Sequence, residues 1–123
     1  MKRILIVDDA MTVRMYHRQL MESIGFEVDE ADNGIEALEK SMTASYDLFL
    51  VDVNMPKMDG YRFVEEIRQN KDLMAMPVIM VSTEAEDKDK DKAYLAGANY
   101  YFVKPVKPDE LKEYVSLLSG EYI

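Results

Sequence analysis

Two apolar, β-favouring runs in this chain each end in aspartate. Residues 4–7 are followed by Asp8 and Asp9, and residues 48–51 are followed by Asp52. Ligands of open parallel α/β sheets bind just beyond the carboxyl ends of the strands. If the two runs form neighbouring strands, we expect the three carboxylates to converge on one small pocket.

Three carboxylates in one pocket favour a hard divalent cation. Two unit charges about 4 Å apart repel by roughly 4 kcal/mol at the effective dielectric of a protein surface, so a neutralising ion stabilises such a cluster. Carboxylate oxygens with room for water suit Mg²⁺. The chain has one histidine and no cysteine, so a zinc or copper site is not expected. The sequence therefore predicts a magnesium site at Asp8, Asp9 and Asp52.

Two more polar residues follow apolar runs later in the chain. Ser82 follows residues 79–81, and Lys104 follows residues 101–103. A hydroxyl and an ammonium beside a carboxylate and a divalent cation suit a tetrahedral dianion such as a phosphoryl group. Asp52 is then the candidate nucleophile, which would form an aspartyl phosphate. Taken singly, Ser82 is better explained as a helix cap and Lys104 as a solvated strand end, but five such polar positions at one sheet edge are hard to obtain by chance.

The elements that must position these residues alternate along the whole chain. We expect strands at residues 3–7, 26–30, 48–51, 78–81 and 100–103, and helices at residues 11–24, 35–44, 86–96 and 108–118, with another around Phe63, Val64 and Ile67. Five βα units with short connections predict an α/β fold with a parallel sheet between two helical layers. Right-handed crossovers favour the flavodoxin-like strand order 2-1-3-4-5, a three-layer sandwich in which the first and third strands are neighbours.

The helical patterns also predict which side chains enter the core. In the helix at residues 35–44, Ile35, Leu38 and Met42 share one face. His17 lies on the apolar face of the first helix, where a lone histidine is more often partly buried structure than a phosphate carrier. The chain has ten methionines, which we expect mainly as flexible core filler, although exposed methionine also suits adaptable contacts.

Length and charge limit the kinds of partner. At 123 residues with a formal net charge of −9, we expect one domain spanning residues 1–123, with no output domain and no nucleic-acid partner. The apolar runs are too short to cross a bilayer and no secretory signal is visible, so we expect no membrane partner and a cytoplasmic location. The charged run at residues 86–92 is typical of a solvated helix face, with local ion pairs.

Taken together, the motifs resemble those of response-regulator receiver domains, and most closely the chemotaxis members of that family. The matching segments are Val7-Asp8-Asp9 with Arg14 after it, Asp52 through Gly60, Met80-Val81-Ser82, and Lys104-Pro105. The resemblance covers essentially the whole chain.

The resemblance implies a role for each site residue. Asp52 would accept a phosphoryl group from a histidine kinase. Asp9 and Asp52 would give carboxylate ligands to Mg²⁺, Asn54 would give its backbone carbonyl, and Asp8 would act mainly through water. Lys104 would pair with the phosphoryl group.

The same resemblance implies a switch and a control on phosphate lifetime. Ser82 would rotate toward the phosphoryl group while Tyr101 turns inward with it. Asn54 and Glu84 occupy positions that tune the rate of hydrolysis in the family. The Lys104-Pro105 peptide bond is often cis in such domains.

These expectations point to a stand-alone phosphorylation switch, not to an enzyme. The surface of the fourth helix, fifth strand and fifth helix would meet an output protein such as a flagellar switch component, and a phosphatase is a further candidate partner. A single-domain phosphorelay or developmental regulator remains an alternative. A phosphatase or phosphotransferase with an aspartyl nucleophile is disfavoured, because Asn54 stands where such enzymes have a second aspartate and there is no space for a cap domain. A flavin-binding domain is disfavoured by the acidic loop after the first strand.

Overall fold

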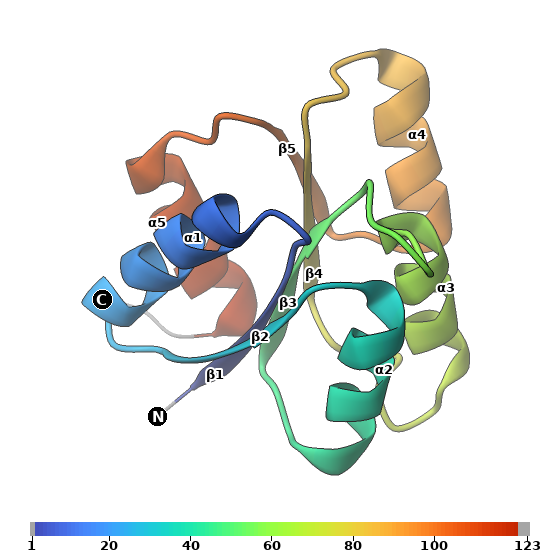
Figure 1. Ribbon diagram of the computed structural model, residues 1–123, viewed down its shortest axis with the longest axis horizontal. Helices are drawn as coiled ribbons and strands as arrows, with labels where there is room; N and C mark the ends of the chain where they lie inside the picture. The colour runs from blue at the N-terminus through green and yellow to red at the C-terminus, as the bar shows by residue number, and fades with distance from the viewer. Residues whose placement is uncertain (1, 121–123) are drawn as a thin grey trace.

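The computed structural model describes residues 2–120 and shows a five-stranded parallel sheet between two layers of helices (Figure 1). The strands are β1 (Arg3–Val7), β2 (Glu27–Ala31), β3 (Leu48–Asp52), β4 (Val78–Ser82) and β5 (Tyr100–Val103). The helices are α1 (Met11–Ser23), α2 (Gly34–Thr43), α3 (Gly60–Gln69), α4 (Asp87–Ala96) and α5 (Pro108–Ser119). The strand order β2-β1-β3-β4-β5 confirms the predicted topology. Within residues 2–120, none of the helices has the length and apolar character that a membrane span requires.

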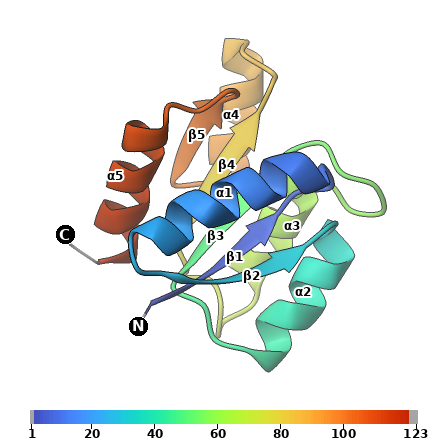
Figure 2. The same cartoon turned by 60° about the vertical axis from the view of Figure 1, so that its left-hand side comes forward.

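The helices divide unequally between the two faces of the sheet. Figures 1 and 2 show α1 and α5 on one face and α2, α3 and α4 on the other. Alternate residues of β1 enter the two cores: Leu5 and Val7 pack on the α2–α4 side, whereas Ile4 and Ile6 pack on the α1/α5 side. A strand covered on both faces needs apolar residues at successive positions, which explains the unbroken runs in the sequence.

The register between β1 and β3 brings their ends to the same edge of the sheet. Ile4 pairs with Leu48, and Val7 pairs with Val51. The residues that follow these last pairs are aspartates on both strands. The predicted adjacency of the first and third strands is therefore confirmed.

Several element bounds differ by one residue from the prediction. β2 runs one residue later than predicted because Ala31 still pairs with Val7, and its carbonyl accepts the amide of Asp8 at 3.0 Å. β3 and β4 each extend by one residue, so that Asp52 and Ser82 end their strands. α1 ends one residue early, at Ser23.

The predicted core face of α2 is wrong at two of its three residues, since only Leu38 packs against the core. Ile35 is 40% exposed and Met42 is 67% exposed, whereas Ala37 and Ser41 are buried. The start of the helix lies against the loop between β3 and α3, where a Cβ atom on Gly34 would lie 2.7 Å from Met58. α2 enters the core through Ala37 with Leu38 packed beside it, and the larger Ile35 and Met42 stay exposed.

The expectation that methionine mainly fills the core is also wrong for several positions. Met21 and Met80 are fully buried. Four others have about half or more of their surface exposed: Met11, Met15, Met42 and Met74. These side chains are available for contacts outside the domain.

α4 is largely solvated, as its charged sequence predicts. Ala93 is its one buried residue. The helix also touches α3 through Tyr61, whose hydroxyl donates to the carbonyl of Asp89 at 3.3 Å and whose ring lies 4.6 Å from the Lys92 ammonium. α4 thus meets the core through few side chains.

Candidate functional site

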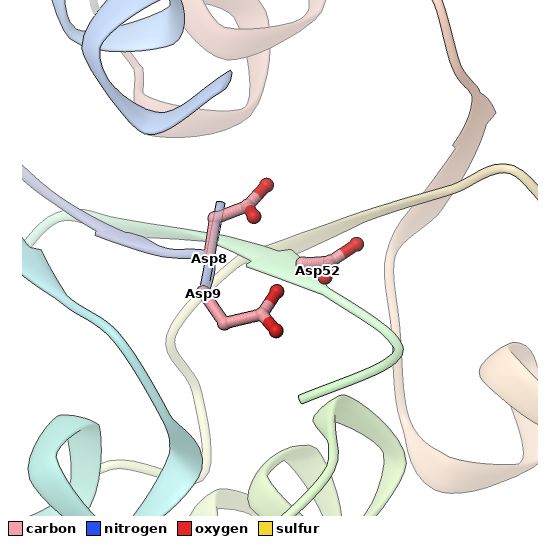
Figure 3. A group of neighbouring side chains, drawn as sticks. All are labelled: Asp8, Asp9 and Asp52. Atoms are coloured by element: carbon pink, nitrogen blue, oxygen red, sulfur yellow. The ribbon is translucent and has the colours of Figure 1, made fainter. Parts of the chain in front are cut away.

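The three aspartates predicted as metal ligands meet at the carboxyl ends of β1 and β3. One carboxylate oxygen from each of Asp8, Asp9 and Asp52 lies within 4.8 Å of the other two. Asp8 and Asp52 are 1% and 6% exposed, whereas Asp9 is exposed. Figure 3 shows the three side chains at this sheet edge. We call them the acidic cluster.

Three hydrogen bonds hold Asp8, apart from the one that its Oδ2 accepts from Lys104. Its amide donates to the carbonyl of Ala31 at 3.0 Å, and its Oδ1 accepts the amide of Ala10 at 2.9 Å. Its carbonyl accepts Nη1 of Arg14 at 2.6 Å. The end of β1 is therefore fixed in both backbone and side chain.

Asp52 is positioned by a close approach between β3 and the start of α3. The amide of Gly60 donates to the carbonyl of Val53 at 2.8 Å. A Cβ atom at position 60 would lie only 2.2 Å from the Asp52 carbonyl oxygen, so a residue without a side chain is needed there. In the loop between them, Lys57 takes a left-handed backbone conformation with φ of 67°.

Lys104 joins the acidic cluster from the end of β5. Its ammonium lies 2.8 Å from Oδ1 of Asp52 and 3.1 Å from Oδ2 of Asp8, and its side chain is 16% exposed. The amide of Lys104 donates to the carbonyl of Ser82 at 2.7 Å, and the Lys104-Pro105 bond is cis. Lys104 is thus a largely buried partner of two carboxylates and not a solvated strand end.

Negative charge exceeds positive charge among the described residues of this pocket. Burial raises the pKa of Asp52 to about 6; the hydrogen bond from Lys104 opposes this rise, and the charges of Asp8 and Asp9 add to it. Burial alone would lower the pKa of Lys104, but its bonds to Asp52 and Asp8 outweigh that effect and raise it. The pocket has one ammonium and three carboxylates. Carboxylate oxygens are hard donors, and three of them together suit a hydrated divalent cation such as Mg²⁺.

Ser82 and Tyr101 are both tied to the loop between β4 and α4. Ser82 is buried at the end of β4, one residue beyond the partner of Asp52 in the register, and its Oγ accepts the amide of Glu84 at 3.0 Å. It does not cap α4, whose N-cap residue is Glu86. Tyr101 is buried, and its hydroxyl donates to the carbonyl of Glu84 at 2.7 Å.

Comparison with known proteins identifies this arrangement. The family model of the response regulator receiver domain matches residues 4–116. The chain belongs to this family. It is 38% identical to the transcriptional regulatory protein ResD of Bacillus subtilis over 89% of this chain and 44% of that protein, so it spans less than half of ResD. It is 36% identical to the chemotaxis protein CheY1 of Helicobacter pylori, over 96% of this chain and 97% of that protein.

Solved receiver domains share the fold. The receiver domain of sensor histidine kinase PA1611 from Pseudomonas aeruginosa superposes with a TM-score of 0.90 at 29% identity, covering 98% of each chain. That structure is described with a magnesium ion coordinated in its active-site cleft. The sequence resemblance to receiver domains is therefore confirmed for both family and fold.

Two predicted site residues of this receiver domain stand apart from the buried cluster. Asn54 and Glu84 are both exposed, in the loops that follow β3 and β4. Their side chains can reach solvent at the mouth of the site. The roles predicted for them in phosphate lifetime remain predictions.

Sequence reasoning missed the ion pairs behind the site. Glu30, on β2, accepts Nε of Arg14 at 2.7 Å and Nη1 of Arg18 at 2.5 Å. Arg14 and Arg18 are four residues apart and so share a helix face. Glu30 could be identified as their common partner only if this face of α1 were known to pack beside the edge strand β2.

An apolar cavity of about 470 Å³ lies beside the site, between α1 and the loop after β5. Its lining residues are Thr12, Val13, Tyr16, His17, Thr83, Lys104, Pro105 and Val106. His17 is 3% exposed, and its Nδ1 is buried without a hydrogen-bond partner among the described residues. Burial lowers the pKa of His17, which favours the neutral ring. The expected burial of His17 is confirmed.

Proposed function

We propose that this receiver domain accepts a phosphoryl group on Asp52 from a histidine kinase, with Mg²⁺ as cofactor. The observation that supports this most directly is the placement of Asp52. Its buried carboxylate lies 2.8 Å from the Lys104 ammonium, in a cluster with Asp8 and Asp9. The magnesium ion described for the PA1611 receiver domain supports the choice of metal.

In the proposed transfer, a carboxylate oxygen of Asp52 attacks the phosphorus of a phosphohistidine. The new P–O bond forms as the P–N bond breaks, and the electron pair of the broken bond stays on the imidazole nitrogen. Lys104 neutralises one phosphoryl oxygen and the Ser82 hydroxyl donates to another. Bound Mg²⁺ would neutralise phosphoryl charge. Asp9, Asp52 and the carbonyl of Asn54 would hold the ion, with Asp8 contributing through water.

The proposed switch starts at the hydroxyl of Ser82. As Ser82 rotates toward the phosphoryl group, its hydroxyl would give up its bond to the amide of Glu84, which removes one hydrogen bond that holds the β4–α4 loop. Tyr101, whose hydroxyl donates to the same residue, carries the change to the face formed by α4, β5 and α5. Asn54 and Glu84, which are exposed in the loops that follow β3 and β4, would set the rate at which the phosphate is hydrolysed.

We further propose that the α4–β5–α5 face controls a protein partner in chemotaxis, such as a flagellar switch component, in the cytoplasm. The match over 97% of CheY1, a chemotaxis protein, supports this choice of process. A phosphatase that removes the phosphoryl group is a further proposed partner. Capture of a flagellar switch protein by beryllofluoride-treated protein, and not by untreated protein, would support this process. Capture of a phosphotransfer protein would instead favour a phosphorelay or developmental role.

Replacing the acceptor tests the proposed reaction. Asp52→Asn should abolish acid-labile incorporation of phosphate from labelled acetyl phosphate, and chelation of Mg²⁺ should abolish it in the wild-type protein. Asp72→Asn, at an exposed position in the α3–β4 loop, is the matched control and should label normally. Persistent labelling of the Asp52→Asn protein would place the acceptor elsewhere.

A further inference from the structure

Arg14 connects the acidic cluster to β2, although it is no part of the cluster itself. Its Nη1 donates to the backbone carbonyl of Asp8 at 2.6 Å, and its Nε donates to Oε1 of Glu30 at 2.7 Å. Its side chain is only 15% exposed. A partly buried guanidinium with two short hydrogen bonds is held in one orientation.

The bond to Asp8 acts on Asp9 through the peptide bond between them. The carbonyl of Asp8 and the amide nitrogen of Asp9 belong to the same planar group. Fixing that carbonyl therefore fixes the plane from which Asp9 begins. Asp8 is also held by hydrogen bonds of its amide and its carboxylate. Asp9 is exposed and lies two positions after the last residue of β1.

Glu30 fixes the guanidinium from the other side. Burial alone would raise the pKa of Glu30, but the hydrogen bonds from Arg18 and Arg14 outweigh that effect and lower it. Glu30 is therefore an anion over the neutral pH range and a strong acceptor. Arg18 binds the same carboxylate, but its bonds run to Glu30 and Glu22, so it offers a comparison with Arg14.

We infer that Arg14 is a positioning residue for the metal site: it holds the Asp8–Asp9 peptide so that the Asp9 carboxylate faces the ion. This inference rests on the proposed Mg²⁺ site. It predicts a change in Mg²⁺ affinity opposite in sign to the change that simple electrostatics predicts. Loss of a positive charge near an acidic cluster should tighten binding of a cation, whereas loss of a positioning contact should weaken it.

Calorimetric titration with MgCl₂ of the wild-type, Arg14→Met, Arg14→Lys and Arg18→Met proteins separates these signs. We expect Arg14→Met to bind Mg²⁺ roughly tenfold more weakly, the lower end of the range for groups that orient metal ligands. Arg14→Lys should fall between, because it keeps the charge but its donors radiate from one nitrogen atom and lack the planar fork that reaches both partners. Arg18→Met should bind as the wild type does. The NMR amide signal of Asp9 should shift in both Arg14 variants before any metal is added.

The outcomes separate this inference from the function on which it rests. If the wild-type protein binds no Mg²⁺, the proposed metal site is wrong and the inference falls with it. If the wild type binds Mg²⁺ and folded Arg14→Met binds it equally well or more tightly, only the inference is overturned. Should Arg14→Met fail to fold, unweakened binding by Arg14→Lys overturns the inference in the same way.

Discussion

The most informative single residue is Asp52, because burial works against the charge that its chemistry needs. Its pKa is raised to about 6, chiefly by burial. Between the ordinary pKa near 4 and this value, the folded protein binds a proton that the unfolded chain has released. Stability therefore falls as pH rises through that window, and the loss remains at neutral pH.

This charge predicts a stabilising substitution. In Mg²⁺-free buffer at neutral pH, Asp52→Asn should be more stable than the wild type, by at most about 3 kcal/mol. The gain should shrink as the pH is lowered from about 6 to about 4, because the wild-type carboxyl is then neutral as well. Urea unfolding of both proteins across this pH range measures the gap, with Asp72→Asn as control. A gap that stays constant across the range would contradict a raised pKa of Asp52 in the folded protein.

At the scale of elements, the site depends on how closely α3 approaches β3. Gly60 begins α3 where a Cβ atom would meet the carbonyl of Asp52. Gly25, after α1, has a left-handed φ of 95°, but a Cβ atom there would have no neighbouring atom within 4 Å. The two glycines are therefore required for different reasons, one steric and one conformational.

The comparison predicts unequal costs. Gly60→Ala should destabilise the domain by about 3 kcal/mol or more, because backbone must move to relieve the clash. Gly25→Ala should cost about 1 kcal/mol, the penalty for a left-handed alanine. Denaturant midpoints at constant slope give both values. Equal costs would mean that the backbone at the end of β3 moves more easily than its packing against α3 implies.

Helix faces were predicted less well than helix positions. The pattern around Phe63, Val64 and Ile67 predicted α3, and all three side chains are buried in the core. The same reasoning failed for α2, since Ile35 and Met42 are exposed. Periodicity shows which residues share a face, but the distance between helix and sheet decides whether small or large residues fill it. In α2 the small residue Ala37 enters the core and Ile35 does not, and the sequence alone does not show this.

At the scale of the whole molecule, topology assembles the site from distant segments. Asp8, Asp52 and Lys104 come from the ends of three strands, and their carboxylate and ammonium groups meet because parallel strands end at one edge. The sequence predicted this convergence, because apolar runs ending in polar residues are a strong signal. It did not predict the pairing of Arg14 with Glu30, which requires the packing of α1 against β2 to be known.

The most direct test of the central claim is a crystal structure with Mg²⁺ and beryllofluoride. We predict beryllium on a carboxylate oxygen of Asp52, with fluorides in hydrogen-bond distance of the Lys104 ammonium and the Ser82 hydroxyl, and Mg²⁺ bound by Asp9 and Asp52. Beryllofluoride bound elsewhere, or a metal ion that does not contact the acidic cluster, would contradict the account.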